Sequence, residues 1–218
     1  MSRWSRYLRS AVNKTFKLCL GNGTRPVFFD VDAVCPPLRE LERHTDAIRG
    51  ELAPFLADRS KLMLYHEFDP RQGHISEGDQ DWRVLYVDWY RANGGHPNRP
   101  HFPVTCGLLD QVPDLLGAFF SVLEPGKSVP AHSGPYLGYL RYHLALHVPE
   151  HNPPILRIGT HDYTWRTDES VMFDDSHRHE VINESDEVRV VLVVDVLRPM
   201  AAPLDWINRR TVWTTMAS

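Results

Sequence analysis

Short hydrophobic runs separated by turns dominate the chain from residue 82 to residue 196. The runs are rich in Val, Leu, Ile and aromatic residues, and turns such as Glu124-Pro125-Gly126 separate them. This pattern predicts six β-strands, at residues 82–88, 118–123, 140–148, 155–158, 171–173 and 188–196. No helix-length segment connects these strands, which disfavours a parallel sheet and favours a sandwich or a barrel.

The first part of the chain has a helical period instead. Five apolar residues between Leu38 and Phe55 recur at near-helical spacing with charged residues between them, so residues 37–57 are predicted to form one amphipathic helix. The basic N-terminal segment lacks the apolar region of a signal peptide. We expect a helix docked on the domain there, and a helix lying on a membrane surface is the alternative.

Segments 66–81 and 92–103 are rich in Gly, Pro, Asp and Asn, and we predict loops for both. The whole chain of 218 residues fits one domain, because a chain of this length buries roughly 70% of its unfolded surface. Within that domain we expect an N-terminal helical and loop region at 1–75 packed on the core, a β core at 76–200, and a C-terminal extension at 201–218.

Composition narrows the setting and the partners. A total of 24 Lys and Arg against 28 Asp and Glu gives no global reason to expect nucleic acid or an anionic membrane, so a small or local partner is favoured. No segment approaches the ~20 apolar residues that span a bilayer. Three scattered cysteines, Cys19, Cys35 and Cys106, argue against a disulfide framework and predict a cytoplasmic location. The run from Trp206 to Trp213 could pack on the barrel or at an interface of a homo-oligomer.

Two short polar runs carry the candidate chemistry. The first is His132-Ser133-Gly134-Pro135 with Arg141 downstream, and the second is 174–180, which contains His179, with Arg189 downstream. Two imidazoles brought together by folding can hold a divalent transition metal, and nearby guanidinium groups can hold an anionic cosubstrate. This combination suggests redox chemistry at an iron.

Spacing alone leaves the ligand set open. His177 and His179 alternate along an extended segment and so would point the same way, and Asp174 and Asp175 could supply oxygen ligands. For the two acids we favour a solvated turn or a role in orienting a histidine. Arg141 and His143 also alternate, so both could contact one ligand.

Residues 118–199 resemble the catalytic domain of the aspartyl/asparaginyl β-hydroxylases, a branch of the iron(II)- and 2-oxoglutarate-dependent oxygenases. Residues 82–117 match that domain more loosely. Several dispersed blocks in the same order carry the resemblance: Glu124-Pro125-Gly126, His132-Ser133-Gly134-Pro135, Leu140-Arg141-Tyr142-His143-Leu144, Phe173-Asp174-Asp175-Ser176 with His179-Glu180, and Arg189 to Pro199.

The resemblance implies a double-stranded β-helix, or jelly roll, with flanking N-terminal α-helices. It implies that His132 and His179 are the catalytic iron ligands and that Arg189 pairs with the distal carboxylate of 2-oxoglutarate. The positions that match Ser121, Arg141 and His143 complete the cosubstrate site in the family. The implied reaction couples oxidative decarboxylation of 2-oxoglutarate by O2 to hydroxylation, with iron(II) as cofactor and ascorbate as a reductant.

Two positions depart from familiar patterns. Gly134 stands where most iron oxygenases carry an acidic ligand; enzymes resembling this branch lack that acid too, and in halogenating relatives a small residue there leaves room for chloride. Tyr139 stands where the animal enzymes of the family carry an arginine that holds the target carboxylate. The expected substrate is therefore an aspartyl- or asparaginyl-like residue, an amino acid, a small peptide or a metabolite. A lipid A type acyl-chain hydroxylase and a non-catalytic jelly-roll metal-binding domain are the alternatives.

Overall fold

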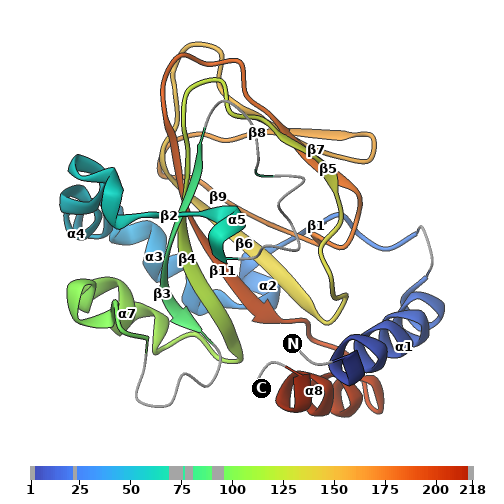
Figure 1. Ribbon diagram of the computed structural model, residues 1–218. Helices are drawn as coiled ribbons and strands as arrows, with labels where there is room; N and C mark the ends of the chain where they lie inside the picture. The colour runs from blue at the N-terminus through green and yellow to red at the C-terminus, as the bar shows by residue number, and fades with distance from the viewer. Residues whose placement is uncertain (1–2, 22–23, 69–75, 77–80, 90–95, 216–218) are drawn as a thin grey trace.

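The core of the computed structural model is a pair of facing antiparallel sheets that form a jelly roll (Figure 1). The structure describes residues 3–21, 24–68, 76, 81–89 and 96–215. The seven-stranded sheet has the order β1 (Phe28–Phe29), β9 (Ser170–Phe173), β6 (Tyr139–His147), β11 (Arg189–Leu197), β4 (Leu115–Leu123), β3 (Trp82–Trp89) and β2 (Met63–Leu64). The four-stranded sheet has the order β5 (Val129–His132), β10 (His179–Ile182), β7 (Ile155–Ile158) and β8 (His161–Thr164). The predicted fold class is confirmed.

All six predicted strands are present, with ends that differ by at most three residues from the predicted bounds. The five strands that the sequence pattern missed, β1, β2, β5, β8 and β10, are only two to four residues long. A run of that length shows few alternations, although the four-residue strands β7 and β9 were predicted. Two of these missed strands, β5 and β10, carry the histidines of the candidate site.

Alternation along the long strands divides the side chains between two hydrophobic cores. On β6, Leu140, Tyr142 and Leu144 pack toward the helices, whereas Arg141 and His143 occupy the alternate positions. The second core fills the space between the two sheets and includes buried residues from both. Because successive side chains point to opposite faces, the polar residues of the long strands enter this interior.

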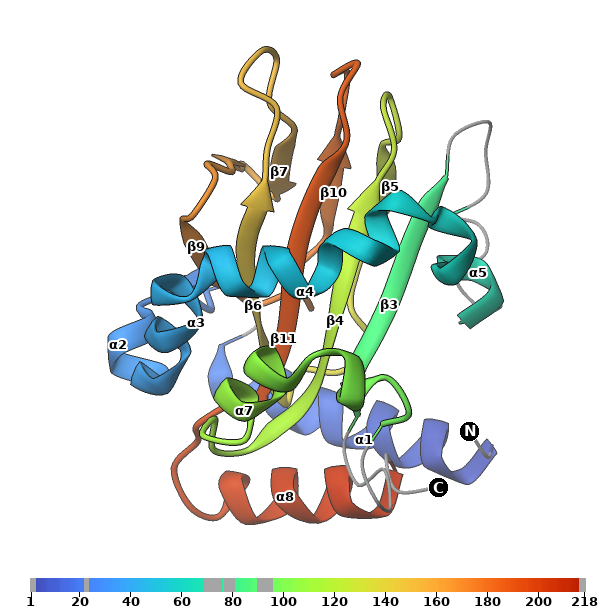
Figure 2. The same ribbon diagram turned by 90° about the vertical axis from the view of Figure 1, so that its left-hand side faces the viewer.

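Helices α3 (Arg39–Arg43), α4 (Thr45–Ala57) and α7 (Pro103–Leu109) cover the outer face of the large sheet (Figure 2). The prediction of one helix over 37–57 is wrong, because a 3₁₀ turn over Pro36–Leu38 begins the segment and the backbone breaks at His44 (φ −120°, ψ 22°). The amide of His44 donates to the carbonyl of Leu41, three residues back, so the helical turn tightens and ends there. The apolar residues of both halves still reach the same core.

The shorter elements complete the outer layer. Helices α2 (Val31–Val34) and α5 (Tyr65–Phe68) and the 3₁₀ turns at Arg59–Lys61 and Arg99–His101 connect the larger elements. The predicted loop at 66–81 therefore begins with helix, and most of that segment lies outside the described residues. The predicted loop at 92–103 is described from residue 96, where it contains the second 3₁₀ turn and ends at the start of α7.

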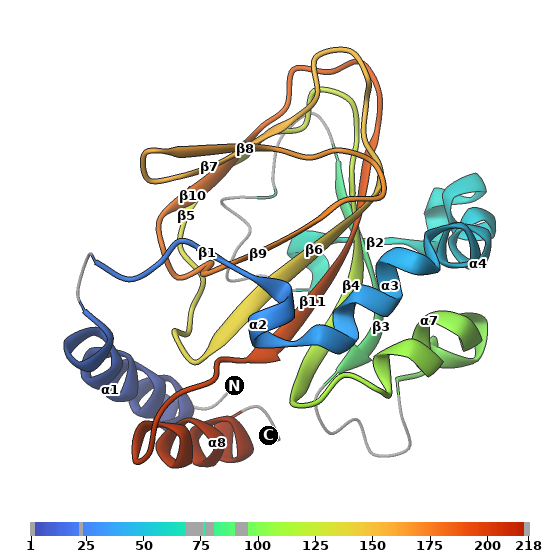
Figure 3. The same cartoon turned by 180° about the vertical axis from the view of Figure 1, so that it is seen from behind.

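Helices α1 (Arg3–Leu20) and α8 (Leu204–Thr215) lie side by side at one end of the barrel (Figure 3). They share a third hydrophobic core with the ends of β6 and β11, to which Phe16, Val212 and Tyr136 contribute. Asn208 of α8 is fully buried, where its amide donates to the carbonyl of Gly138 at 2.7 Å and accepts from the hydroxyl of Tyr136 at 2.7 Å. The terminal segments therefore pack on the core, while the division at 75 and 200 stays a prediction.

Among the helices that the structure describes, none combines the length and the apolar character that crossing a bilayer requires.

Candidate functional site

His132 and His179 face each other across two neighbouring strands. His132 ends β5, His179 begins β10, and the antiparallel register places the two residues directly opposite. Their ring centroids are 4.2 Å apart, with an angle of 55° between the ring planes. His179 is buried and His132 is partly exposed. The predicted pair is therefore brought together, with one ring accessible from outside.

Backbone carbonyls orient both rings in the same way. Nδ1 of His132 lies 2.9 Å from the carbonyl oxygen of Pro130, and Nδ1 of His179 lies 2.9 Å from that of His177. A ring that donates through Nδ1 carries its lone pair on Nε2, the form that binds a metal. Burial, together with His132, lowers the pKa of His179 to about 3, so the ring is neutral at ordinary pH.

The rival ligands belong to a separate cluster. Asp174 is fully buried, accepts a hydrogen bond from Arg25 at 3.2 Å and forms an ion pair with Arg198 at 2.6 Å. Nε2 of His177 lies 3.7 Å from the same carboxylate. The interpretation of Asp174 as part of a solvated turn is wrong, because two buried cations compensate it. This cluster joins the segment before β1 to the ends of β9 and β11.

Asp175 fills the space beside Gly134. A Cβ atom at position 134 would overlap the carboxylate of Asp175, and the Gly134 amide donates to the Asp175 carbonyl at 2.8 Å. The carboxylate accepts from the Tyr139 hydroxyl at 2.7 Å and lies 3.1 Å from Arg141. Burial raises the pKa of Asp175 to about 6. Like Asp174, this acid is buried rather than solvated, and its bulk explains why position 134 has no side chain.

Arg189 is a buried cation without a counterion. It is 2% exposed, its Nε has no hydrogen-bond partner, and Nη2 lies 3.4 Å from the hydroxyl of Ser121. Its guanidinium carbon lies 4.8 Å from the centroid of the Trp165 ring. Within the described ranges no carboxylate pairs with it, and burial lowers its pKa to about 9. Since an unpaired buried charge costs several kcal/mol, the site is built to receive an anion.

His143 and Ser121 lie in the same interior. The His143 ring stacks on Trp165 at 5.9 Å between centroids and meets Phe173 edge-on at 5.0 Å. Its Nδ1 is buried without a partner. Burial, with Arg189 and Arg141 nearby, holds the pKa of His143 well below its usual value. The hydroxyl of Ser121 accepts from the indole nitrogen of Trp82 at 3.0 Å, so it is held in place beside Arg189.

Arg141 lies in the same interior, but two carboxylates already compensate its charge. Its Nε and Nη2 donate to the two carboxylate oxygens of Asp195 at 2.8 Å each, and Nη1 lies 3.1 Å from Asp175. Asp195 stands directly opposite on β11. A role for Arg141 in cosubstrate binding stays a prediction, and in this structure it is bound between two aspartates.

The sequence patterns did not reveal two aromatic residues that line the interior beside His143. Trp165 is 1% exposed and contacts both Arg189 and His143, while Phe173 contacts both His143 and His179. Trp165 is therefore a core residue, whereas Trp89 is exposed. An even number of positions separates Asp195 from Arg189 on one strand, so both side chains lie on the same face. This period was the sequence signal that could have predicted Asp195 in the interior.

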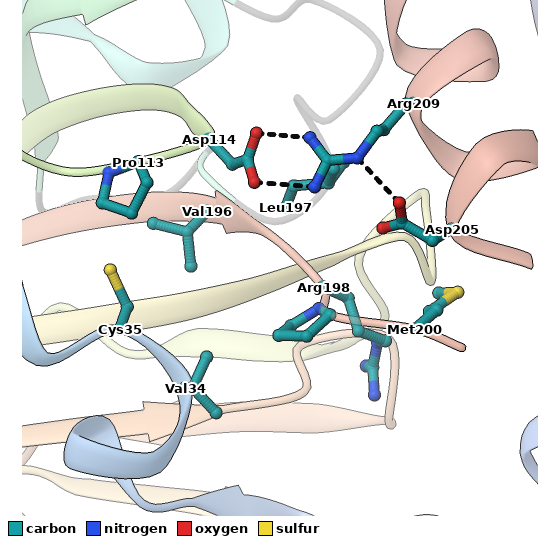
Figure 4. Close-up of a pocket in the computed structure, with 11 residues that line it drawn as sticks. Val34, Cys35, Pro113, Asp114, Val196, Leu197, Arg198, Met200, Asp205 and Arg209 are labelled. Atoms are coloured by element: carbon teal, nitrogen blue, oxygen red, sulfur yellow. Dashed lines mark hydrogen bonds and ion pairs between the residues drawn. The ribbon is translucent and has the colours of Figure 1, made fainter. Parts of the chain in front are cut away.

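A separate hollow of about 320 Å³ lies outside the barrel, between α2 and α8 (Figure 4). Its charged lining residues already have partners, because Arg209 donates to Asp114 at 2.6 and 2.9 Å and to Asp205 at 2.8 Å, and Arg198 forms an ion pair with Asp174. Neither histidine of the opposed pair lines this hollow. We therefore assign no role to it.

Comparisons with known proteins agree on the family. The family model described as aspartyl/asparaginyl beta-hydroxylase matches residues 42–199. An ornithine lipid ester-linked acyl 2-hydroxylase of Rhizobium tropici is 35% identical over 190 residues, which are 87% of this chain and 66% of the relative. The human aspartyl/asparaginyl beta-hydroxylase is 30% identical over 171 residues, which are 76% of this chain and 22% of the relative. The chain thus spans less than two thirds of either relative. A solved prolyl-4-hydroxylase of Pseudomonas putida has a TM-score of 0.48 at 14% identity, covering 88% of this chain and all of its own.

Proposed function

Since the chain belongs to the aspartyl/asparaginyl β-hydroxylase family, we propose that it is an iron(II)- and 2-oxoglutarate-dependent hydroxylase. The observation that carries this proposal is the opposed pair His132 and His179, whose Nδ1 atoms are both bound to backbone carbonyls. The buried Arg189 without a counterion supports the cosubstrate.

The residues present fit both groups. Two imidazoles whose Nδ1 atoms lie against backbone carbonyls suit a ferrous ion through Nε2, although within the described residues no third His, Cys, Asp or Glu joins them in a cluster. A guanidinium in a low-dielectric interior suits one carboxylate of a dicarboxylate. When bound, iron and 2-oxoglutarate would supply, with O2, the oxidising power for hydroxylation.

The residues of the protein would bind and orient the metal and the cosubstrate and would shield them from water. His132 and His179 would hold the metal, and Arg189 and the Ser121 hydroxyl would hold the distal carboxylate. Neutral His143 would offer a hydrogen-bonding nitrogen, since its Nδ1 has no protein partner. Trp165 and Phe173 would exclude water from the anion site, which strengthens each charge-assisted bond there.

Two substrate classes are candidates. The first is an aspartyl- or asparaginyl-like residue, amino acid, small peptide or metabolite. The second is the acyl chain of a lipid, by analogy with the ornithine lipid relative. The environment of Tyr139 favours the lipid acyl chain. The buried hydroxyl of Tyr139 donates to Asp175, and burial raises the pKa of Tyr139 well above its usual value. Position 139 thus offers no positive charge to a substrate carboxylate.

The first experiment measures succinate formed from 2-oxoglutarate by the purified protein with iron(II) and ascorbate, with and without a chelator. Iron-dependent succinate is expected, and the variants His132→Ala and His179→Ala should form none. An ornithine lipid and an aspartyl peptide, supplied together, are then screened for a mass gain of one oxygen.

Three outcomes of these measurements separate the remaining alternatives. Succinate formation by His179→Ala at the wild-type rate would disprove the iron assignment. If the wild-type protein binds iron and 2-oxoglutarate but forms no succinate with any substrate, it is a binding domain. If the iron-loaded protein does not bind 2-oxoglutarate, the cosubstrate assignment is wrong.

A further inference from the structure

Helix α1 has a second hydrophobic face that points away from the barrel. Its inner face packs on the third core through Val12 and Phe16. On the opposite side, positions 4, 7, 11 and 18 follow helical spacing and are exposed. The large residues of this stripe are Trp4 (62% exposed), Tyr7 (77%) and Leu18 (82%). A water-facing helix rarely places such residues along one line.

Helix α8 extends the stripe at the same end of the molecule. Trp206 and Trp213 lie seven residues apart and so share a helix face, and both are exposed. Arg210 lies over the Trp213 ring, with its guanidinium carbon 5.2 Å from the ring centroid. Helices α1 and α8 lie side by side (Figures 1 and 3) and together carry five exposed large residues at this end of the molecule, which we call the end surface: Trp4, Tyr7, Leu18, Trp206 and Trp213.

Charge on α1 is all of one sign. The helix carries five basic residues and no acidic residue, whereas the whole chain has a net charge of −4. Arg6, Lys14 and Lys17 are exposed beside the stripe, and within the described part of the chain none of the three pairs with a carboxylate. A concentrated positive potential therefore surrounds the exposed aromatic and aliphatic side chains.

We propose that the end surface docks on a bilayer that contains anionic lipid. Trp and Tyr side chains combine an apolar body with a polar tip and suit the boundary between headgroups and acyl chains. Basic residues beside them attract anionic headgroups, as in other helices that lie in the membrane plane. Lys is depleted at the centre of protein interfaces, yet Lys14 lies on the same face as Ala11 and Leu18, so a lipid surface fits better than a protein partner.

The proposed docking helix is tied directly to the candidate site. The side-chain amide of Asn13 donates to the carbonyl of Pro135 at 3.0 Å and accepts from the amide of Leu137 at 3.0 Å. This segment follows His132 and Gly134 in the chain. A bilayer that receives α1 would therefore lie close to the loop that leaves the first histidine. The docking goes beyond the proposed hydroxylation and does not depend on it.

Vesicle co-sedimentation of the full chain, without iron or 2-oxoglutarate, tests the proposal. We expect the protein to partition to vesicles of phosphatidylcholine mixed with phosphatidylglycerol and only weakly to phosphatidylcholine alone. Binding to the anionic vesicles should decrease as the salt concentration rises. The double variant Tyr7→Ser/Leu18→Ser should lower the partition coefficient at least about tenfold through lost apolar burial. Lys14→Glu/Lys17→Glu should lower it by at least about tenfold through lost attraction.

Matched controls change exposed residues elsewhere. Met63→Ser on β2 removes an exposed apolar side chain, and Arg166→Glu reverses an exposed charge between β8 and β9, so both should bind vesicles like the wild type. Thermal unfolding of each variant checks the fold, and two independent double variants guard against misfolding of one.

Three results would overturn the proposal. One is wild-type protein that stays in the supernatant with anionic vesicles. Another is an equal loss of binding in the controls. The third is a wild-type protein that forms a dimer and does not bind vesicles, together with a Tyr7→Ser/Leu18→Ser variant that is monomeric. A second copy of the chain would then cover this surface. Succinate formation is measured separately, so failure of docking and failure of the hydroxylase assignment are distinguishable.

Discussion

At the scale of single residues, the site is defined by which charges have partners. Arg141 and Arg189 are both arginines of the barrel interior, but Arg141 has two aspartate partners, whereas no carboxylate among the residues that the structure describes pairs with Arg189. The same physical rule therefore assigns them different roles. A compensated arginine holds the wall together, and an uncompensated one marks a place for a ligand.

Replacing each arginine by methionine separates the two roles. Arg189→Met removes a buried unpaired cation, so the ligand-free protein should melt at the wild-type temperature or above it, while 2-oxoglutarate binding falls at least about 30-fold. Arg141→Met leaves the buried Asp175 and the partly buried Asp195 without their cation, so stability should fall by about 3–5 kcal/mol. Thermal unfolding and calorimetric titration measure both quantities. Strong destabilisation by Arg189→Met would contradict the assignment of an anion site.

Gly134 is predicted to tolerate no side chain. Gly134→Ala places a Cβ atom where the carboxylate of Asp175 lies, so the variant should lose about 1–3 kcal/mol of stability and should bind iron more weakly. Gly50→Ala is the matched control, because no atom lies within 4 Å of its added Cβ and α4 should gain about 0.5–1 kcal/mol. Chemical denaturation measures the stability of both variants. Equal changes in stability would contradict the conclusion that Asp175 occupies the space beside Gly134.

At the scale of elements, side chains of one segment complete the ends of another. Helix α7 has no side-chain cap of its own. Glu51 of α4 supplies it from outside, accepting from the amides of Val104 at 2.5 Å and Thr105 at 3.0 Å and from the Thr105 hydroxyl at 2.6 Å. A negative charge at a helix N-terminus also stabilises the helix dipole. Two of the three helices that cover the large sheet are thus fastened to each other.

Removal of this cap should loosen α7. Glu51→Ala is expected to lower the free energy of unfolding by about 0.5–2 kcal/mol, the usual contribution of a cap. Hydrogen exchange should rise in 103–109 more than in α4. Glu184→Ala removes an exposed acid elsewhere and should change neither quantity. A uniform rise in exchange over both helices would mean that Glu51 stabilises the whole layer instead.

At the scale of the whole molecule, a buried cluster joins chain segments that are far apart. Arg25 precedes β1, Asp174 follows β9 and Arg198 follows β11, and 149 residues separate Arg25 from Asp174. Burial raises the pKa of Asp174, but Arg198, Ser176 and Arg25 outweigh it, and the net pKa lies below the usual value. The ionised carboxylate is therefore the form that the fold favours.

The sign of this shift predicts acid sensitivity. Because the folded pKa of Asp174 is depressed, its contribution is complete above the usual carboxyl value of about 3.9 and is lost as pH falls below it. Asp174→Asn should lower stability by about 3–5 kcal/mol at neutral pH and should flatten the stability profile below about pH 4. Asp186→Asn, which removes an exposed carboxylate elsewhere, should leave the profile unchanged. An Asp174→Asn profile parallel to that of the wild type would disprove this assignment.

The amino-acid sequence alone predicted six of the strands and singled out the two histidine runs. The strands depend on period-two alternation within a few residues, which is also why Arg141 and His143 could be placed on one face of a strand. Only the tertiary structure decided which charges pair. Asp195 compensates Arg141, Asp175 occupies the space beside Gly134, and Asp174 is buried between two arginines. The meeting of α1 with α8 also depends on packing between distant segments. Local periodicity carries no information about such contacts, because each partner lies tens of residues away in the chain.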